Sequence, residues 1–181
     1  MMKLLVISGG PRSFGRSKIV ANFIANKYGI ELIDLSNSLI PLYDGTIEQN
    51  ELDAVQLWRE KVKAANGVLV ISPEYHNGMS GVLKNALDFL GSDQFSNKPV
   101  SLVAVAGGGK GGINALNNMR IVLRGLYANV LPKQLVLDPD HFQMERKKVT
   151  DPAAQSIDEL VKQVSLYVRA WEHVKAEEAV S

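Results

Sequence analysis

A strand–loop–helix pattern over residues 67–90 constrains the fold of this chain more than any other stretch. Val68 to Ile71 are consecutive apolar residues, which suits a strand covered on both faces, as in a parallel sheet. Pro73 ends this strand because proline has no N–H for a ladder, and a polar loop runs on to Ser80. Ser80 is a suitable N-cap for the amphipathic helix that follows. We therefore expect the loop at the carboxyl end of a parallel strand, where open α/β sheets bind ligands.

The rest of the chain repeats this alternation of strand and helix. Apolar runs predict further strands at residues 4–7, 30–35, 100–106 and about 129–137, and amphipathic segments after each predict helices. Five strands and five helices in alternation predict a doubly wound α/β fold. The flavodoxin-like strand order 2-1-3-4-5 would place the loops after strands 1, 3 and 4 side by side. We expect a single domain over residues 1–181, with a frayed tail after about residue 175.

Composition excludes several classes of function. The formal net charge of +1 argues against nucleic acid and against an anionic membrane surface as partners, and we interpret the basic cluster 146–148 as a solvated turn. The chain has no cysteine, which excludes disulfides and thiolate chemistry, and its scattered histidines predict no metal site. No apolar run approaches the roughly 20 residues of a membrane span, and the start lacks the features of a signal peptide. We therefore expect a cytoplasmic protein.

The first loop, residues 9–17, is a candidate phosphate site. It precedes a predicted helix N-terminus, where free N–H groups and the helix dipole favour an anion. Gly10 and Gly15 allow close approach of the backbone, while Arg12 and Ser17 add a positive charge and a hydroxyl donor. The spacing is not that of a Rossmann site. It is one residue from a nucleotide triphosphatase P-loop, with Arg16 where lysine is required, and no later strand ends in an aspartate suited to Mg²⁺.

The two other loops complete the candidate site. The glycine-rich loop 107–112 suits a planar ring pressed against main chain, because no Cβ intrudes there. Within it, Lys110 is interpreted as an exposed charge or as a contact to a cofactor phosphate. The central loop contains His76, which we interpret as a contact to the ring edge or the substrate rather than as a catalytic acid. No serine nucleophile elbow accompanies it.

Longer stretches of the chain resemble a known family. Pro73-Glu74-Tyr75 followed by Gly81-x-Leu83-Lys84-Asn85-Ala86-Leu87-Asp88 is similar to the signature of the NAD(P)H-dependent FMN reductases. The runs 105–120 and 127–139 resemble especially the azo-reducing bacillar members of that family. This chain departs from the usual pattern, since the family often has hydroxyl residues at Gly10 and Gly15, usually has Asn at His76, and has Pro at Ser80.

The resemblance implies a flavodoxin-like fold, bound FMN, NADPH as the electron donor, and a homodimer or homotetramer. It further implies hydride transfer to a small aromatic acceptor, with cleavage of an azo bond to two amines over two cycles. The alternatives are a general FMN, quinone or chromate reductase and a flavodoxin-like electron carrier without enzyme activity. Arg12, Gly15, Arg16 and Ser17 would bind the FMN phosphate end, and Pro73, Glu74, Tyr75, His76, Gly107, Gly108 and Gly109 would line the isoalloxazine.

Overall fold

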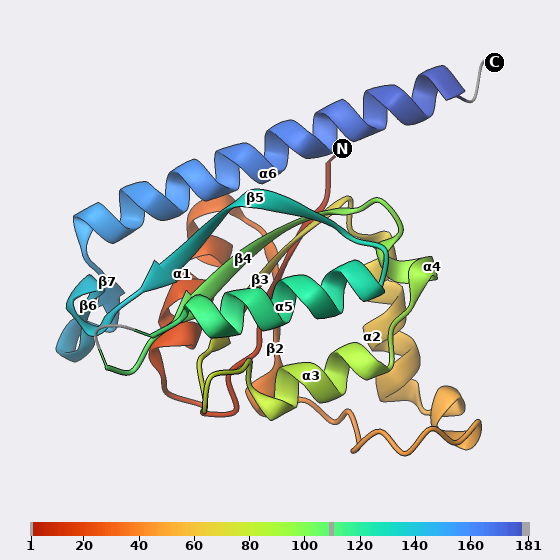
Figure 1. The fold of residues 1–181 in the computed structure, drawn as a ribbon, viewed down its shortest axis with the longest axis horizontal. Helices are drawn as coiled ribbons and strands as arrows, with labels where there is room; N and C mark the ends of the chain where they lie inside the picture. The colour runs from red at the N-terminus through yellow and green to blue at the C-terminus, as the bar shows by residue number, and fades with distance from the viewer. Residues whose placement is uncertain (1, 109–110, 179–181) are drawn as a thin grey trace.

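A five-stranded parallel sheet forms the centre of the computed structural model, which describes residues 2–108 and 111–178 (Figure 1). The strands lie in the order β2-β1-β3-β4-β5, and every neighbouring pair is parallel. Their bounds are β1 (Leu4–Ser8), β2 (Glu31–Asp34), β3 (Gly67–Pro73), β4 (Pro99–Val105) and β5 (Asn129–Leu137). The predicted fold class and strand order are both confirmed.

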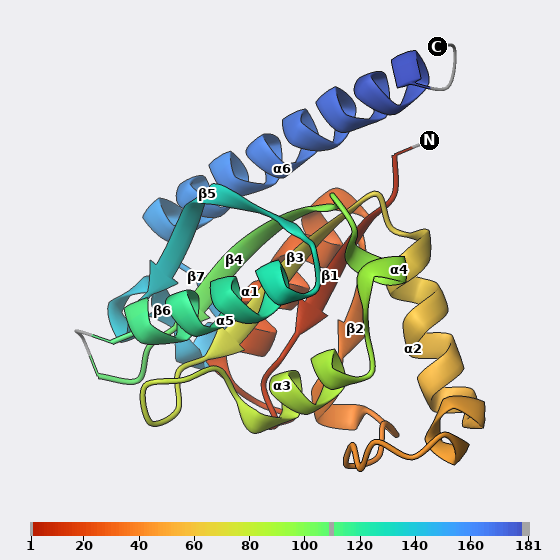
Figure 2. The same ribbon diagram turned by 45° about the vertical axis from the view of Figure 1, so that its right-hand side comes forward.

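Helices cover the sheet on both faces (Figures 1 and 2). Their bounds are α1 (Arg16–Tyr28), α2 (Asp53–Ala64), α3 (Gly81–Asp88), α4 (Ser92–Phe95), α5 (Ile113–Gly125) and α6 (Asp151–Glu178). Alternate strand residues face opposite layers, so Leu5 and Ile7 pack with α2, α3 and α5, whereas Val6 packs with α1 and α6. Residues 68–71 are fully buried, as their unbroken apolar character predicts for a strand covered on both faces.

Two helices have well-defined caps, one of which, at Ser80, was predicted. Gly29 ends α1 in the left-handed conformation, with φ of 63°. The hydroxyl of Ser80 accepts a hydrogen bond from the Leu83 N–H at the start of α3. The last helix, α6, has Asp151 as its first residue rather than as its cap. The Ala154 N–H donates to the Thr150 carbonyl, so the helical ladder begins one residue earlier.

Several short elements were not predicted. The loop after β2 contains two 3₁₀ helices, Leu35–Asn37 and Glu48–Glu51, and α4 lies between α3 and β4. The predicted polar loop after β5 contains an antiparallel hairpin of β6 (Phe142–Gln143) and β7 (Lys148–Val149). Each is too short for a periodic pattern, which is why periodicity did not reveal them. None of the described helices is long and apolar enough to cross a membrane.

A buried lysine joins α2 to the start of β4. Lys98 is 9% exposed, and its ammonium donates hydrogen bonds to the carbonyl oxygens of Val62 and Lys63 in the last turn of α2. A cation there complements the negative end of the helix dipole. Burial, and secondarily the positive charge of Lys175, lower the pKa of Lys98 from 10.5 to about 8. The folded state therefore releases this proton at a lower pH than the unfolded chain does.

The free energy of unfolding is expected to rise with pH between about 8 and 10.5 because of Lys98. In that window the unfolded chain binds more protons than the folded chain, so deprotonation favours folding by about 1–3 kcal/mol. Lys98→Met removes the titrating group and should lack this rise. Urea unfolding across this pH window measures the free energy of unfolding. Lys63→Met, at an exposed position of α2, is the control. Identical pH profiles for the native chain and Lys98→Met would contradict the assignment.

Candidate active site

Three loops from different parts of the chain meet in one cavity at the carboxyl ends of β1, β3 and β4. The cavity has a volume of about 260 Å³. It is lined by Gly10, Arg12, Phe14, Gly15, Arg16, Ser17, Pro73, Glu74, Tyr75, Val105, Ala106, Gly107 and Met144. The strand order alone had predicted that the loops after these three strands lie side by side.

The first loop presents an uncapped helix N-terminus to this cavity. Gly15, the N-cap of α1, is extended and provides no side-chain hydrogen bond to the helix. The Ile19 N–H donates to the Gly15 carbonyl at 3.1 Å, so the N–H groups before it stand outside the helical ladder. The Arg16 Nε is buried and has no hydrogen-bond partner among the described residues. Free N–H groups and an unpaired buried guanidinium nitrogen suit an anion such as phosphate.

Gly10 and Ser17 pack so closely that a side chain at Gly10 would meet the Ser17 hydroxyl. A Cβ built on Gly10 would lie 2.4 Å from the Ser17 Oγ, and Ser17 itself is only 6% exposed. The hydroxyl of Ser17 thus lies directly against the glycine backbone of the loop. An alanine at this position would therefore have to displace the Ser17 hydroxyl.

Side-chain contacts connect the three loops. The guanidinium of Arg12 lies 5.9 Å from the centre of the Tyr75 ring, which links the first loop to the central one. The Arg16 Nη1 donates to the Ala106 carbonyl at 3.5 Å, at the end of β4. The Ser80 hydroxyl donates to the Gly9 carbonyl, so the residue at which the family usually has proline anchors the first loop.

The central loop forms a tight two-residue turn. The N–H and carbonyl groups of Tyr75 and Gly78 form reciprocal hydrogen bonds of 2.9 and 3.0 Å. Both residues between them are left-handed, with φ of 48° at His76 and 64° at Asn77, as a type I′ turn requires. Asparagine adopts this conformation more readily than histidine, which gives a local reason for the family's preference at His76. His76 is exposed at the tip and does not line the cavity.

Glu74 has a structural partner that sequence reasoning missed. Its Oε2 accepts a hydrogen bond of 2.9 Å from the Ala115 N–H in the first turn of α5. A carboxylate at a helix N-terminus is stabilised by the helix dipole. A Cβ built on Gly111 would lie 2.8 Å from the Glu74 Oε1, so the glycine-rich loop packs against the same carboxylate. Glu74 therefore positions the glycine-rich loop relative to the central loop.

The glycine-rich loop contributes an open rim. Gly107 and Gly108 are exposed, and a Cβ built on either would meet no atom within 4 Å. Gly107 lines the cavity and Gly108 does not. The predicted contact at Gly109 and the charge at Lys110 lie outside the described residues. Phe14, Val105, Ala106 and Met144 also line the cavity and were not among the predicted contacts. Phe14 belongs to the first loop, which was already a candidate phosphate site. Met144 belongs to a segment whose sequence predicts only a polar loop.

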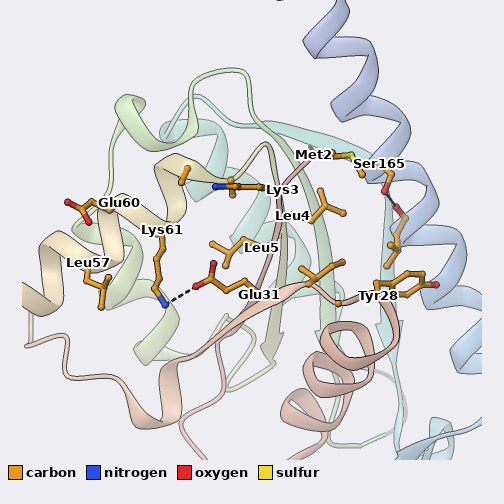
Figure 3. A pocket seen from close by; sticks show the side chains of 15 residues that line it. Met2, Lys3, Leu4, Leu5, Tyr28, Glu31, Leu57, Glu60, Lys61 and Ser165 are labelled. Atoms are coloured by element: carbon orange, nitrogen blue, oxygen red, sulfur yellow. Dashed lines mark hydrogen bonds and ion pairs between the residues drawn. The ribbon is translucent and has the colours of Figure 1, made fainter.

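A larger cavity of about 710 Å³ lies at the opposite edge of the sheet (Figure 3). Its lining includes the amino-terminal ends of β1 and β2 and the last turn of α2, and an ion pair of 2.8 Å joins Lys61 to Glu31 within it. Among the described helices that line this cavity, α1 and α2 end there and α6 passes it with Val161 and Ser165, so none of them begins at this cavity. By volume alone the larger cavity would be the candidate active site. We assign the site to the smaller cavity because its groups suit an anion. Among the described residues, no group of three or more His, Asp or Glu could hold a metal ion.

Comparison with known proteins shows the family of this chain. A family model described as NADPH-dependent FMN reductase matches residues 2–142. The chain belongs to the NADPH-dependent FMN reductase family. Within this family, the chain is 51% identical over 174 residues to an NADPH azoreductase from Bacillus sp. (strain OY1-2), covering 96% of this chain and 97% of the relative. It is 31% identical to an FMN-dependent NADPH-azoreductase from Staphylococcus aureus (strain USA300), covering 78% and 79% of the two chains.

Solved structures share the fold of this FMN reductase family member at low sequence identity. The flavoenzyme NAD(P)H:(acceptor) oxidoreductase FerB from Paracoccus denitrificans superposes with a TM-score of 0.71 at 20% identity, covering 93% of this chain and 96% of FerB. An FMN-dependent NADH-azoreductase from Bacillus anthracis, in complex with FMN, has a TM-score of 0.60 at 12% identity, covering 93% and 100%. At these identities the likeness establishes the fold alone.

Proposed function

We propose that this chain is an FMN-dependent NADPH azoreductase. The observation that carries the proposal is the meeting of an uncapped helix N-terminus, an unpaired guanidinium nitrogen and a glycine rim in one cavity. Similarity over nearly the full chain to a relative named NADPH azoreductase supports it. In this proposal residues 1–181 form one FMN-binding domain, and the FMN accepts hydride from NADPH and passes it to an aromatic acceptor.

The residues that line the cavity suit the phosphate and the ring of FMN. Arg12, Arg16 and the Ser17 hydroxyl would bind its phosphate together with the first N–H groups of α1. Pro73, Tyr75 and Gly107 would line the ring, largely through main chain, with Glu74 holding the two ring loops at a fixed separation. Gly10 keeps the phosphate end open because any side chain there would displace the Ser17 hydroxyl.

Gly10→Ala and Ser17→Ala are expected to weaken FMN binding by about tenfold each, but not additively. The alanine methyl would force the Ser17 hydroxyl out of position, so each variant loses the same hydrogen bond. Once Ser17 is alanine, the added methyl lies at an ordinary distance of 3.6 Å from its Cβ. The double variant should therefore bind FMN about as well as Ser17→Ala alone. Titration of the native protein and the three variants with FMN measures the four Kd values. A loss of affinity in the double variant equal to the two single losses combined would contradict the shared hydrogen bond.

The chemistry proposed for the acceptor balances over two cycles. One NADPH and one proton reduce R–N=N–R′ to R–NH–NH–R′. A second NADPH and a second proton then cleave this hydrazo compound to two amines. The exposed glycine rim offers few side chains that could select one acceptor, so the general reductase of quinones, chromate or free flavin is the second candidate. The exposed His76 is proposed as a substrate contact. No described acidic side chain other than the α5-bonded Glu74 lines the cavity, which favours water as the proton source.

Purified protein mixed with NADPH and methyl red tests the function. Bleaching of the dye with consumption of two NADPH per dye molecule is expected. A flavodoxin-like electron carrier would bind FMN but consume no NADPH under these conditions. Consumption of NADPH with a quinone but without bleaching would favour the general reductase.

An exposed apolar segment supports a homodimer or homotetramer. Leu39, Leu42 and Ile47, which precede α2, are 87%, 81% and 76% exposed. Leu42 also borders a cavity of about 280 Å³ between this segment and α3. Exposed apolar side chains along one short segment are typical of an interface, and a second copy of the chain is the proposed partner. The proposed location is the cytoplasm. A monomeric mass in solution would refute the oligomer.

A further inference from the structure

The β6–β7 hairpin packs beside the phosphate loop, at the end of the sheet where β4 and β5 finish (Figure 1). Phe142 is 8% exposed, and the guanidinium of Arg16 lies 6.0 Å from the centre of its ring. The Thr150 N–H donates to the His141 carbonyl at 2.9 Å and closes the base of the hairpin. Met144, in the turn of the hairpin, lines the cavity. The hairpin is therefore a wall of the proposed active site.

The turn of this hairpin carries the densest positive charge in the chain. Arg146, Lys147 and Lys148 are consecutive and exposed, and Glu145 is the single acid between β6 and β7. The ammonium of Lys147 lies 5.0 Å from the centre of the Phe14 ring. No described carboxylate forms an ion pair with that ammonium. A cation without an anionic partner among the described residues thus stands beside Phe14, which lines the cavity.

Phe14 provides a flat apolar surface next to that cation. Its ring is 76% exposed, although the residue also lines the cavity. An exposed aromatic face stacks with a purine base, and base–aromatic stacking contributes about 1–3 kcal/mol in nucleic-acid complexes. A neighbouring ammonium suits a phosphate group attached to the same nucleoside. An aromatic face and a cation in contact are the two groups that an adenosine phosphate requires.

We infer that Phe14 and Lys147 bind the adenosine 2′-phosphate portion of NADPH, with Lys147 distinguishing NADPH from NADH. The inference rests on the proposed function, because it assigns the donor of that reaction. NADPH differs from NADH by the 2′-phosphate alone, so discrimination requires a cation that contacts this group. Arg12 and Arg16 are assigned to the FMN phosphate, whereas Lys147 stands outside the cavity lining and stays available when FMN is bound.

Lys147→Gln in the FMN-loaded protein is expected to raise KM for NADPH about tenfold, while kcat and the KM for NADH change less than twofold. Phe14→Leu should instead raise both KM values by the same factor, because the two dinucleotides share the adenine. Lys63→Gln, at the opposite edge of the sheet, is the matched control and should alter neither KM. An equal change for both dinucleotides in Lys147→Gln, or no change at all, would overturn the assignment.

Equilibrium binding separates this inference from the proposed function. Adenosine 2′,5′-bisphosphate should bind the FMN-loaded protein, and Lys147→Gln should raise its Kd about tenfold. The Kd of 5′-AMP should stay the same in both proteins. If the native protein oxidises neither dinucleotide, the proposed function fails, yet this titration still decides the role of Lys147. A Kd for the bisphosphate that is unchanged in Lys147→Gln refutes that role.

Discussion

Replacing Arg12 and Arg16 together by glutamine is expected to weaken FMN binding by at least about a hundredfold. Both side chains line the cavity beside the uncapped N-terminus of α1, and the Arg16 Nε is buried without a partner. A hydrogen bond to a charged group contributes about 1.5–3 kcal/mol, so the loss of two such bonds corresponds to two or more orders of magnitude in Kd. Quenching of FMN fluorescence during titration measures this Kd.

Riboflavin provides the matched ligand for this experiment, since it has the same ring and ribityl chain but no phosphate. Its Kd should change less than threefold in the double variant, because the two arginines are assigned to the phosphate. Arg16 also donates to the Ala106 carbonyl and packs on Phe142, so its removal alone could loosen the site. Arg12→Gln leaves those contacts intact and should still weaken FMN binding. Equal losses for FMN and riboflavin would contradict the phosphate assignment.

Gly112→Ala is expected to destabilise the protein by about 3 kcal/mol, because it combines backbone strain with overpacking. Gly112 is the N-cap of α5 and has φ of 96°, a conformation that side chains disfavour. A Cβ there would lie 2.6 Å from the Val136 Cγ1 in β5. For a chain of this length, such a loss lowers Tm by roughly 6–12 °C. Thermal unfolding followed by circular dichroism measures it.

The control for this variant lies at the other end of the same helix. Gly125 is the last residue of α5, and a Cβ built on it would meet no atom within 4 Å. Gly125→Ala should leave Tm unchanged or raise it slightly, because alanine favours helix by up to about 1 kcal/mol. A similar Tm for the two variants would show that the fit of Gly112 against β5 does not contribute to stability.

The strands and the loops that carry the site were predictable because each is a long or compositionally extreme segment. The run Val68–Ile71 is buried on both faces, so its apolar character is continuous and marks a parallel strand. The strand order then dictates which loops meet, and the cavity lies at that meeting point. Membership of the FMN reductase family, predicted from the Pro73-Glu74-Tyr75 motif and the helix after it, is confirmed by the family model and the Bacillus relative. The site residues themselves stay predictions, which the variants above test.

Other features depend on contacts between distant residues and leave no pattern in the sequence. The carboxylate of Glu74 bonds to the N–H of Ala115, a pairing across 41 positions that no local motif encodes. Met144 reaches the cavity because the β6–β7 hairpin packs on α1, whereas its own segment reads only as polar. The exposure of His76 follows from a two-residue turn in which neither residue is glycine, so the usual turn signal is missing.

Hydrogen–deuterium exchange of the apoprotein with and without FMN shows directly whether FMN binds in the smaller cavity. FMN is expected to slow exchange in residues 9–19, 73–78 and 105–108, which contain the residues of the three loops that line the smaller cavity. No change is expected in residues 28–31 and 57–65, which contain residues that line the larger cavity at the opposite edge of the sheet. Protection confined to that opposite edge, or no protection anywhere, would contradict the assignment of FMN to the smaller cavity.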